Sequence, residues 1–475
     1  MPAELAGKRT VMMRDLHPQG ASVVVTMPFR ALRTTNGSLK QGMTGRWCIN
    51  AVAQGLHYVS QVSIPLVQRS IVKTTSFWKA GHTPTLLASF FYFDLSFMVW
   101  VLLGPLAVQI SQDLGLTAAQ KGLMVATPLL AGALLRIVMG VLVDHLKPKK
   151  AGAIGQVIVI IGLAWAWLGS LKSYETMLSL GVLLGVAGAA FAVALPLASR
   201  WYPPEHQGTA LGIAGAGNSG TAFAALFAPT LALAYGWQNV FGLCLIPLGV
   251  AFLVYMIFAK DSPGAPPPKS ITEYLHVLKD KDAWWFMFFY AVTFGGFSGL
   301  ASSLTIYFNG QYGLSPVTAG YFTAACVFAG SMVRPIGGII ADRIGGIKTL
   351  SLMYVLAGSF LFIASLGMQS YVAALAVFVL AMLALGTGNG AVFQLVPQRF
   401  RKEIGVMTGL VGMAGGIGGF YLASSLGYSK QVTGSYQFGL TIFAALAVSA
   451  LVGLSYVKNR WRTTWGSAAM TTAKI

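Results

Sequence analysis

The chain has 475 residues, of which 55% are hydrophobic and 9% are charged, and its mean hydropathy is +0.68. A typical soluble domain carries about 25% charged residues, so this composition excludes an ordinary soluble protein and indicates an integral membrane protein. The formal net charge of +19 would suit nucleic-acid binding, but the basic residues precede or flank hydrophobic blocks, which indicates membrane orientation and lipid contact instead.

Residues 1–82 are the first predicted segment, a basic, disordered cytoplasmic extension. They hold ten Lys and Arg residues against Glu4 and Asp15, and no stretch is long enough to span a bilayer. The acid-poor composition also suits a targeting peptide, but a hydrophobic core and a cleavage site are not evident. A start codon assigned too early is a further alternative, and we expect no transport role for this segment.

Twelve hydrophobic segments follow, each close to the roughly 20 residues that a membrane-spanning helix needs. The predicted spans are 86–108, 122–143, 152–170, 176–198, 209–233, 239–259, 284–307, 317–340, 350–367, 371–394, 404–427 and 437–457. A Pro-rich, charged break divides them six and six. We therefore predict an all-α membrane protein with two six-helix bundles (83–259 and 283–457), a cytoplasmic linker (260–282) and a cytoplasmic tail (458–475).

Basic residues are distributed unequally between the two sides of this topology. The loops on the side of the linker carry thirteen Lys and Arg residues, and the opposite loops carry three, Lys121, Lys172 and Lys430. Basic loops stay in the cytoplasm. The sequence therefore predicts a multi-pass protein of the cell inner membrane with both termini cytoplasmic.

An internal repeat relates the two bundles. The pattern Arg-x3-Gly-x3-Asp occurs twice, 198 residues apart, at Arg136, Gly140 and Asp144 and at Arg334, Gly338 and Asp342. A glycine pattern that begins at Gly208 recurs from Gly405, 197 residues later. Two independent patterns at nearly the same spacing indicate homologous halves. We expect both aspartates to pair with basic residues or to cap helix ends, and assign them and the two pattern glycines to gating.

This arrangement resembles the parallel two-half repeat of the major facilitator superfamily, whose substrate sites lie near the bilayer midplane between the halves. The segments "GVLVDHLKPKK" and "GIIADRIGGIK" are similar to the signature that this family carries after its second and eighth helices. The first copy lacks the glycine that often follows the aspartate, and Leu146-Lys147 stands there. The resemblance implies transport by alternating access.

Away from helix ends, three formal charges lie within the predicted spans: Asp94, Arg136 and Arg334. A charge inside the bilayer costs several kcal/mol and marks a functional site by default. The repeat gives the two arginines equivalent positions, where an anion between them would relieve their repulsion, and the guanidinium fork suits a planar oxyanion. The alternative is that each arginine pairs with a carboxylate, but Asp94 alone cannot serve both.

The fifth and eleventh spans contain "GTALGIAGAGNSGTAFA" and "GVMTGLVGMAGGIGGFYLA". Small residues let membrane helices approach closely, and these two segments also resemble the nitrate signatures of the nitrate/nitrite porter family. The match runs from about residue 83 to 457. The signature glycines are Gly215, Gly217, Gly220, Gly415, Gly416, Gly418 and Gly419.

The resemblance to that family implies which residues bind substrate. It implies two arginines that hold the anion, two phenylalanines above and below it, and a hydrogen-bonding tyrosine and asparagine: Arg136, Arg334, Phe191, Phe294, Tyr290 and Asn218. A flat, singly charged, weakly hydrated ion suits two aromatic faces and two guanidiniums. Ordinary packing is the alternative interpretation of the two phenylalanines.

Asp94 departs from the simplest version of that site. A nitrate/nitrite exchanger is charge-balanced, whereas moving one negative charge inward costs about 2.3 kcal/mol per 100 mV of inside-negative potential, which two protons per nitrate would reverse. Two interpretations stay open. Asp94 carries a proton in symport, or it forms a structural pair with Arg136 or Arg334 or a helix-packing hydrogen bond.

The sequence therefore predicts a monomeric transporter for nitrate uptake and assimilation by proton symport, with nitrite as a second substrate. Nitrate/nitrite antiport, transport of another small anion and a membrane anion sensor are the alternatives. We predict no catalytic residue, metal, cofactor or nucleic-acid partner. The three cysteines (Cys48, Cys244, Cys326) lack ligand spacing, and "GAGNSG" lies inside a span without the strand that a dinucleotide site requires.

Overall fold

A computed structural model of the chain describes residues 11–13, 23–25, 76–169, 171–263, 272, 276–400 and 403–465. Most of the predicted extension 1–82, including Cys48, and parts of the linker and the tail lie outside these residues. Met1–Lys73 and Thr74–Ile475 are two separate units. The described part of the first unit is an antiparallel pair of strands, β1 (Val11–Met13) and β2 (Val23–Val25), with Met12 opposite Val24.

Twelve helices in the described part of the second unit are long and apolar enough to cross a membrane, which confirms the predicted number of spans. After the short α2 (Phe77–Ala80), the first six spans are α3 (Thr83–Trp100) with α4 (Leu103–Leu114), α5 (Ala118–Leu146), α6 (Pro148–Leu168), α7 (Tyr174–Gly188) with α8 (Phe191–Ser199), α9 (Pro204–Gly215) with η2 (Ala216–Ser219) and α10 (Gly220–Tyr235), and α11 (Trp237–Phe258). The second six are α13 (Lys281–Tyr312), α14 (Pro316–Met332) with α15 (Arg334–Ile344), α16 (Gly346–Ser365), α17 (Tyr371–Arg399), α18 (Ile404–Thr433) and α19 (Gln437–Thr463).

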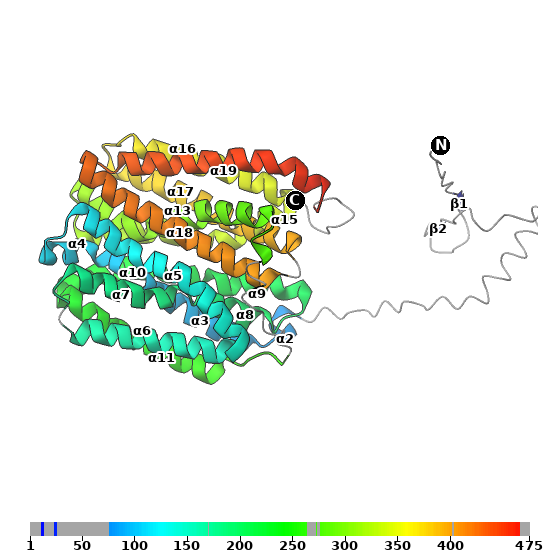
Figure 1. Ribbon diagram of the computed structural model, residues 1–475, viewed down its shortest axis with the longest axis horizontal. Coiled ribbons are helices and arrows are strands. Elements are labelled where there is room, and N and C mark those ends of the chain that lie inside the picture. Colours follow the sequence, from blue (N-terminus) through cyan, green and yellow to red (C-terminus); the bar gives the residue numbers. More distant parts are fainter. Residues whose placement is uncertain are drawn as a thin grey trace, which may run out of the picture. The chain divides into compact units, whose positions relative to one another are not determined.

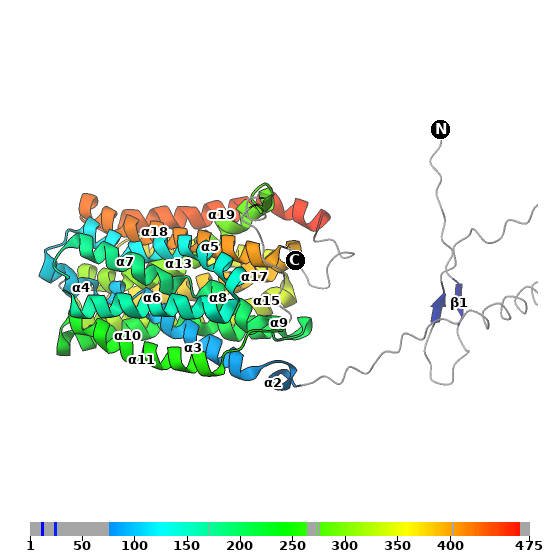
Figure 2. The ribbon, with the colours of Figure 1, turned by 60° about the horizontal axis from the view of Figure 1, so that its bottom comes forward.

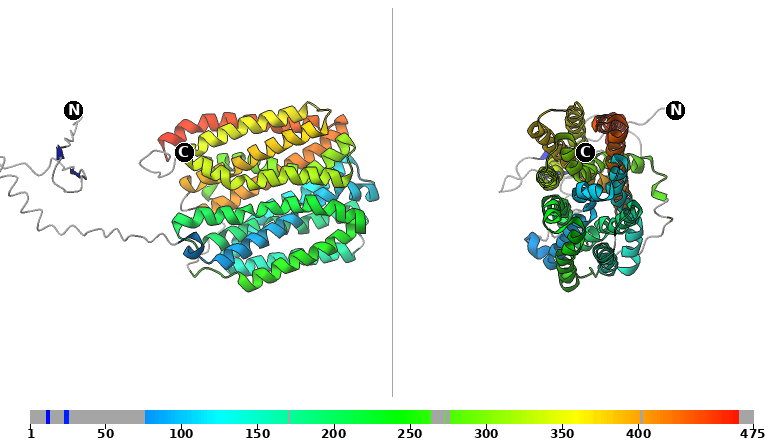
Figure 3. Two further views of the ribbon diagram at one scale, coloured as in Figure 1. Left: turned by 180° about the vertical axis from the view of Figure 1, so that it is seen from behind. Right: turned by 90° about the vertical axis from the view of Figure 1, so that its left-hand side faces the viewer.

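The helices gather into two bundles that meet along a seam. The end-on view shows the blue-to-green helices of the first bundle apart from the yellow-to-red helices of the second (Figure 3). Across the seam α5 packs on α18 and α10 packs on α14 (Figure 1). Small residues permit this approach, because a Cβ added to Gly122 would lie 2.7 Å from the Cα of Gly427.

The two ends of the helical unit differ in chemistry. At one end, which we call the basic end, Asp144 pairs with Arg200 across 3.3 Å, and α9 and α15 of opposite bundles meet (Figure 2). At the other, the short-turn end, α4, α13 and α18 stop at Gly115, Gly313 and Gly434. There the seam is closed by a 3.1 Å hydrogen bond from the Ala118 amide to Gln431.

Four spans are interrupted within their length. The breaks lie at Val101–Leu102, at Ala189–Ala190 directly before Phe191, at the 3-10 turn η2 and at Val333 directly before Arg334. Irregular backbone inside a membrane is tolerated where protein or a cavity surrounds it, and transporter substrate sites commonly lie at such breaks. Three of the six residues predicted to bind substrate therefore lie at interruptions. Phe191 and Arg334 directly follow a break, and Asn218 belongs to η2.

A buried carboxylate joins three helices of the second bundle at the basic end. Asp282 is 5% exposed and accepts hydrogen bonds from Arg399 Nε at 2.9 Å, from Trp461 Nε1 at 2.8 Å and from Arg460. These partners hold the end of α19 against the start of α13. The last helix consequently runs to Thr463, past the predicted end of the bundle at 457.

The turn after α5 holds a strained lysine. Lys147 has φ 68° and ψ 153°, and it is the only residue other than glycine with a positive φ in the described chain. Its repeat equivalent, 198 residues later, is Gly345, with φ 104° and ψ 136°. Both halves thus use one turn geometry, which suits glycine and costs other residues about 1–3 kcal/mol.

A Lys147→Gly variant is therefore expected to be more stable than the wild type by about 1 kcal/mol, after the entropy cost of glycine is subtracted. Thermal unfolding of the purified protein in detergent measures the change. The matched control is Lys150→Gly in the first turns of α6, where glycine costs about 1 kcal/mol relative to a good helix former. Equal destabilisation by both substitutions would contradict the assigned strain.

Candidate functional site

Arg136 lies in the middle of α5 with its side chain only 1% exposed. Its Nε donates to the carbonyl of Gly188 at 3.1 Å, and its Nη1 donates to the carbonyl of Gly412 in the opposite bundle. The remaining nitrogen, Nη2, is buried and has no hydrogen-bond partner in the described part of the chain. Arg136 therefore contacts both bundles and keeps one guanidinium nitrogen without a partner among the described residues.

Arg334 is the first residue of α15 and is 9% exposed. Its Nη2 donates to the Tyr290 hydroxyl at 3.1 Å. Its Nη1 is buried and, among the described residues, has no partner. The two repeat-related arginines thus each present an unsatisfied guanidinium nitrogen inside the protein.

Aromatic rings enclose the two guanidiniums. The Arg136 Cζ lies 5.2 Å from the Phe191 ring centroid and 5.3 Å from that of Phe294. Tyr290 stacks on Phe294 at 5.1 Å. The structure therefore brings together five of the six residues predicted to bind substrate, and both predicted phenylalanines border the Arg136 guanidinium.

Two further aromatic residues of this cluster were missed by the sequence reasoning. Trp100 lies 5.4 Å from the Arg136 guanidinium, and Phe393 on α17 lies 5.7 Å from that of Arg334. The repeat could have indicated Phe393. Gly185 of α7 and Pro196 of α8 flank Phe191, and a glycine and a proline recur 201 residues later, at Gly386 and Pro397. At this spacing, Phe393 stands one residue after the equivalent of Phe191.

Among the described residues, no carboxylate forms an ion pair with Arg136 or Arg334. The ion pairs among the described residues involve Asp144, Asp280 and Asp282, and none includes Arg136 or Arg334. A buried charge without a partner is costly. Two such charges with unused guanidinium nitrogens, framed by ring faces, have the chemistry to bind a small anion.

Asp94 contacts the fifth span, at η2, rather than an arginine. Its Oδ1 accepts a 2.6 Å hydrogen bond from the Ser219 hydroxyl, and its side chain is 4% exposed. The pairing with Arg136 or Arg334 that the sequence left open is not present in the described structure, whereas the helix-packing hydrogen bond is. Asp94 thereby sits at the start of α10, where the helix dipole favours a negative charge.

Asn218 occupies the same interrupted turn. It is 1% exposed, and its Oδ1 has no hydrogen-bond partner in the parts of the chain described above. The adjacent Gly217 lies against Phe93, and the ring centroids of Phe93 and Phe191 are 5.9 Å apart. Asn218 thus flanks the aromatic cluster without a direct hydrogen bond to either arginine.

The signature glycines differ in their surroundings. A Cβ on Gly415 would lie 2.7 Å from a Tyr290 ring carbon and 2.8 Å from a Phe294 ring carbon. The other crowded positions face neighbouring helices: Gly217, Gly220, Gly416, Gly418 and Gly419. At Gly215 nothing lies within 4 Å. Gly415 is therefore the signature glycine that shapes the site itself.

A Gly415→Ala carrier is expected to lose about tenfold or more in kcat/KM for its anion, because a displacement near 1 Å of positioning groups costs up to about 100-fold. The added methyl group would push Tyr290, and with it the Arg334 contact, out of place. Uptake kinetics in proteoliposomes measure the loss. Gly215→Ala is the matched control, and equal losses in both variants would contradict this role.

The residues assigned to gating lie at the basic end. The pairing expected for Asp144 is present with Arg200, both side chains being less than 20% exposed. Asp342 is exposed and takes part in no ion pair among the described residues. Gly140 is half-buried on α5, and a Cβ added to Gly338 would meet nothing within 4 Å. Their role in gating stays a prediction.

The sequence model of the Major Facilitator Superfamily matches residues 86–423. A nitrite extrusion protein of Bacillus subtilis is 32% identical over 77% of this chain and 93% of its own. A probable nitrate/nitrite transporter NarK2 of Mycobacterium tuberculosis is 33% identical over 78% of this chain and 95% of its own. A probable nitrate transporter NarT of Staphylococcus carnosus is 34% identical over 77% of this chain and 94% of its own.

A solved structure of a bacterial homolog of the human lysosomal transporter Spinster, in an inward-facing and occupied conformation, has the same fold. It has a TM-score of 0.61 and 19% sequence identity, and the match covers 80% of this chain and 97% of that chain. With this fold, the family match and these relatives, the chain is an integral membrane transporter rather than an enzyme. It belongs to the major facilitator superfamily and, within it, to the nitrate/nitrite porter family.

Proposed function

We propose that this protein carries nitrate across the cell inner membrane by alternating access and couples nitrate uptake to proton symport. The observation that carries the proposal is the pair of buried arginines, one from each bundle, that each keep an unpartnered guanidinium nitrogen among aromatic rings. An anion bound by both arginines would tie the bundles together, and its release would let them separate.

The chemistry of the site favours a small planar oxyanion. The unused nitrogens of Arg136 and Arg334 would donate to its oxygens, and charge-assisted hydrogen bonds are about twice as strong as neutral ones. Phe191 and Phe294 supply flat faces for a flat ion, Tyr290 orients Arg334, and Asn218 offers a further polar group. Nitrate and nitrite both meet these demands, and the names of the relatives point to the same two ions.

The proposed orientation places the basic end in the cytoplasm. Thirteen basic residues in the loops of that side, against three on the other, support it through the positive-inside rule. Both termini are then cytoplasmic. The pairing of Asp144 with Arg200 would close or release the inner gate, together with Gly140, Gly338 and Asp342.

Asp94 is our candidate for the proton-coupling residue. It is a buried carboxylate, and it bonds to Ser219, the neighbour of Asn218. Protonation would weaken its hold on the start of α10 and so reach the signature turn. Nitrate/nitrite antiport is the second candidate function, and it is favoured by the similarity to a protein described as a nitrite extrusion protein.

Transport in proteoliposomes tests the proposal. The purified carrier should accumulate labelled nitrate when an inward proton gradient is imposed, and nitrite should compete. Uptake that ignores the proton gradient but requires internal nitrite would establish antiport instead. A carrier that moves organic acids and leaves nitrate untouched would overturn the proposed substrate.

A further inference from the structure

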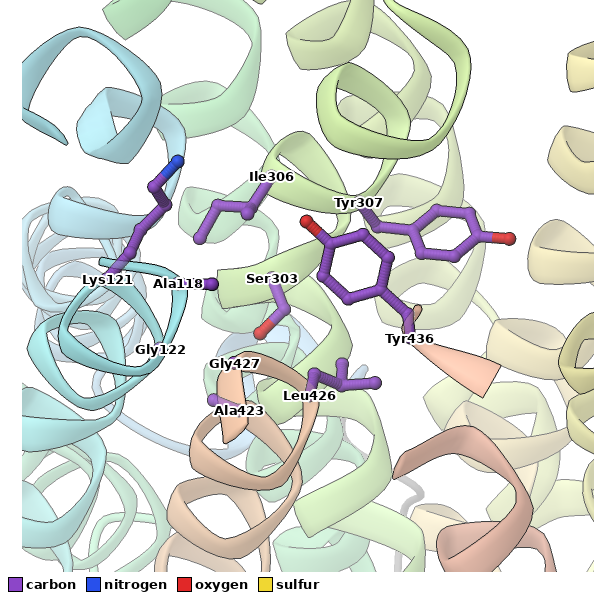
Figure 4. A pocket seen from close by; sticks show the side chains of 10 residues that line it. All are labelled: Ala118, Lys121, Gly122, Ser303, Ile306, Tyr307, Ala423, Leu426, Gly427 and Tyr436. Atoms are coloured by element: carbon purple, nitrogen blue, oxygen red, sulfur yellow. The ribbon is translucent and has the colours of Figure 1, made fainter. Parts of the chain in front are cut away.

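A cavity lies on the seam, away from the arginines. It is small, with a volume of about 30 Å³, and lies near the short-turn end. The first bundle lines it with Ala118, Lys121 and Gly122 of α5, and the second lines it with residues of α13, α18 and the turn after α18 (Figure 4). Because it lies between the bundles, a movement that separates them at this end opens it.

One polar group of this cavity, the Ser303 hydroxyl, is buried and unsatisfied among the described residues. Ser303 is 4% exposed, and its hydroxyl has no hydrogen-bond partner in the described part of the chain. Buried helix serines usually bond back to their own helix, as Ser298 does to the Phe294 carbonyl at 2.9 Å. The Ser303 hydroxyl instead points toward Gly427 and Ala423 of α18 (Figure 4).

Lys121 supplies a positive charge to the same cavity. It is half-buried, it makes no ion pair with a carboxylate of the described residues, and no lining residue is acidic. In Figure 4 its stem runs along one wall, with the ammonium at the upper edge. Long lysine side chains bury their stems and keep the charge near water in this way. A cation and an unpaired hydroxyl without a counter-charge suit a small anion.

The cavity is aligned with the arginine site. Lys121 stands 15 residues before Arg136 on α5, which is about 22 Å along a helix, and Ser303 stands 9 residues after Phe294 on α13, about 14 Å. The third lining helix, α18, also carries Gly412 and Gly415 of the site. The same three helices therefore build both places, and the cavity continues the site toward the short-turn end.

We propose that this cavity is a second anion site, at which Lys121 and Ser303 hold the transported anion on its way between the external medium and the central arginines. The inference rests on the proposed function and on the proposed orientation. Lys121 attracts the anion at the mouth, and Ser303 donates a hydrogen bond farther in. The site then governs entry from outside and leaves entry from the cytoplasm unaffected.

Side-specific kinetics test this proposal in oriented proteoliposomes with nitrate as the probe. Lys121→Gln is expected to raise the KM for external nitrate about fivefold, the size of a partly exposed ion pair, and to leave the KM for internal nitrate unchanged. Ser303→Ala should shift the external KM in the same direction by a smaller factor. A loss of fold would move both values, so the split separates binding from structure.

The chain offers a matched control for each change. Lys172→Gln removes an exposed basic residue outside the cavity lining, and Ser424→Ala removes a hydroxyl that bonds to its own helix at 2.7 Å. Unchanged external KM in both cavity variants, or equal rises on both sides, would overturn the second site while nitrate transport stands. A wild-type carrier without nitrate transport from either side would instead overturn the proposed function, and this inference with it.

Discussion

An Arg136→Lys carrier is expected to fold and to take up nitrate with a kcat/KM about 100-fold below that of the wild type. Lysine keeps the charge but loses the planar fork. It cannot hold the Gly188 and Gly412 carbonyls and donate to the anion at once, and losing a hydrogen bond to a charged group costs about 1.5–3 kcal/mol. Initial rates of labelled nitrate uptake measure the effect.

The control for this variant is Arg343→Lys, an exposed arginine nine residues after Arg334. Its uptake should match that of the wild type. Thermal unfolding of both variants separates lost binding from lost fold. Full uptake by Arg136→Lys would refute recognition of the anion by the guanidinium fork, because that result would show that charge alone suffices.

An Asp94→Asn carrier is expected to exchange nitrate across the membrane but to lose its accumulation by a proton gradient. The amide retains an oxygen that accepts from Ser219, so the start of α10 keeps its contact, but it binds no proton in the cycle. With two protons per nitrate the carrier moves one net positive charge inward. Without them it moves one negative charge, a difference of about 4.6 kcal/mol at 100 mV.

Two measurements on the same vesicles separate the outcomes for Asp94. Counterflow of labelled nitrate reports exchange, and proton entry during nitrate uptake reports coupling. Asp113→Asn is the control, because that exposed carboxylate bonds to Trp237 at 2.6 Å at the short-turn end. Intact coupling in Asp94→Asn would leave Asp94 with its structural role alone.

Much of this architecture could be predicted from the sequence, because the lipid environment leaves little choice. A span needs a long apolar segment, and a repeat of two patterns at offsets of 197 and 198 residues imposes two equivalent bundles. The arginines were detectable for the same reason, since a charge within an apolar span is rare. Lys147 shows the limit, because the repeat aligns it with Gly345 but does not reveal that both adopt the same strained geometry.

The remaining parts depend on contacts that leave no mark in the sequence. Trp100 is one among many aromatic residues, and its packing on the Arg136 guanidinium follows from the way the helices cross, whereas the repeat could have indicated Phe393. The partner of Asp94 could not be predicted, because Ser219 becomes available only where the fifth span tightens into the 3-10 turn η2. The cavity at the seam is lined by helices of both bundles. From the sequence alone, Ser303 could not be distinguished from the neighbouring serine of α13.

The interruptions of the spans have a mechanical consequence. An unbroken helix acts as a stiff rod, so a displacement at one end reaches the other end undiminished. Phe191 and Arg334 each begin a new helical segment, and Asn218 lies within the turn that separates two. These side chains therefore lie at flexible points of their spans. Under the proposed function, a small rotation of backbone dihedrals there would let them follow a departing anion, while the parts of the same spans at the short-turn end stay packed.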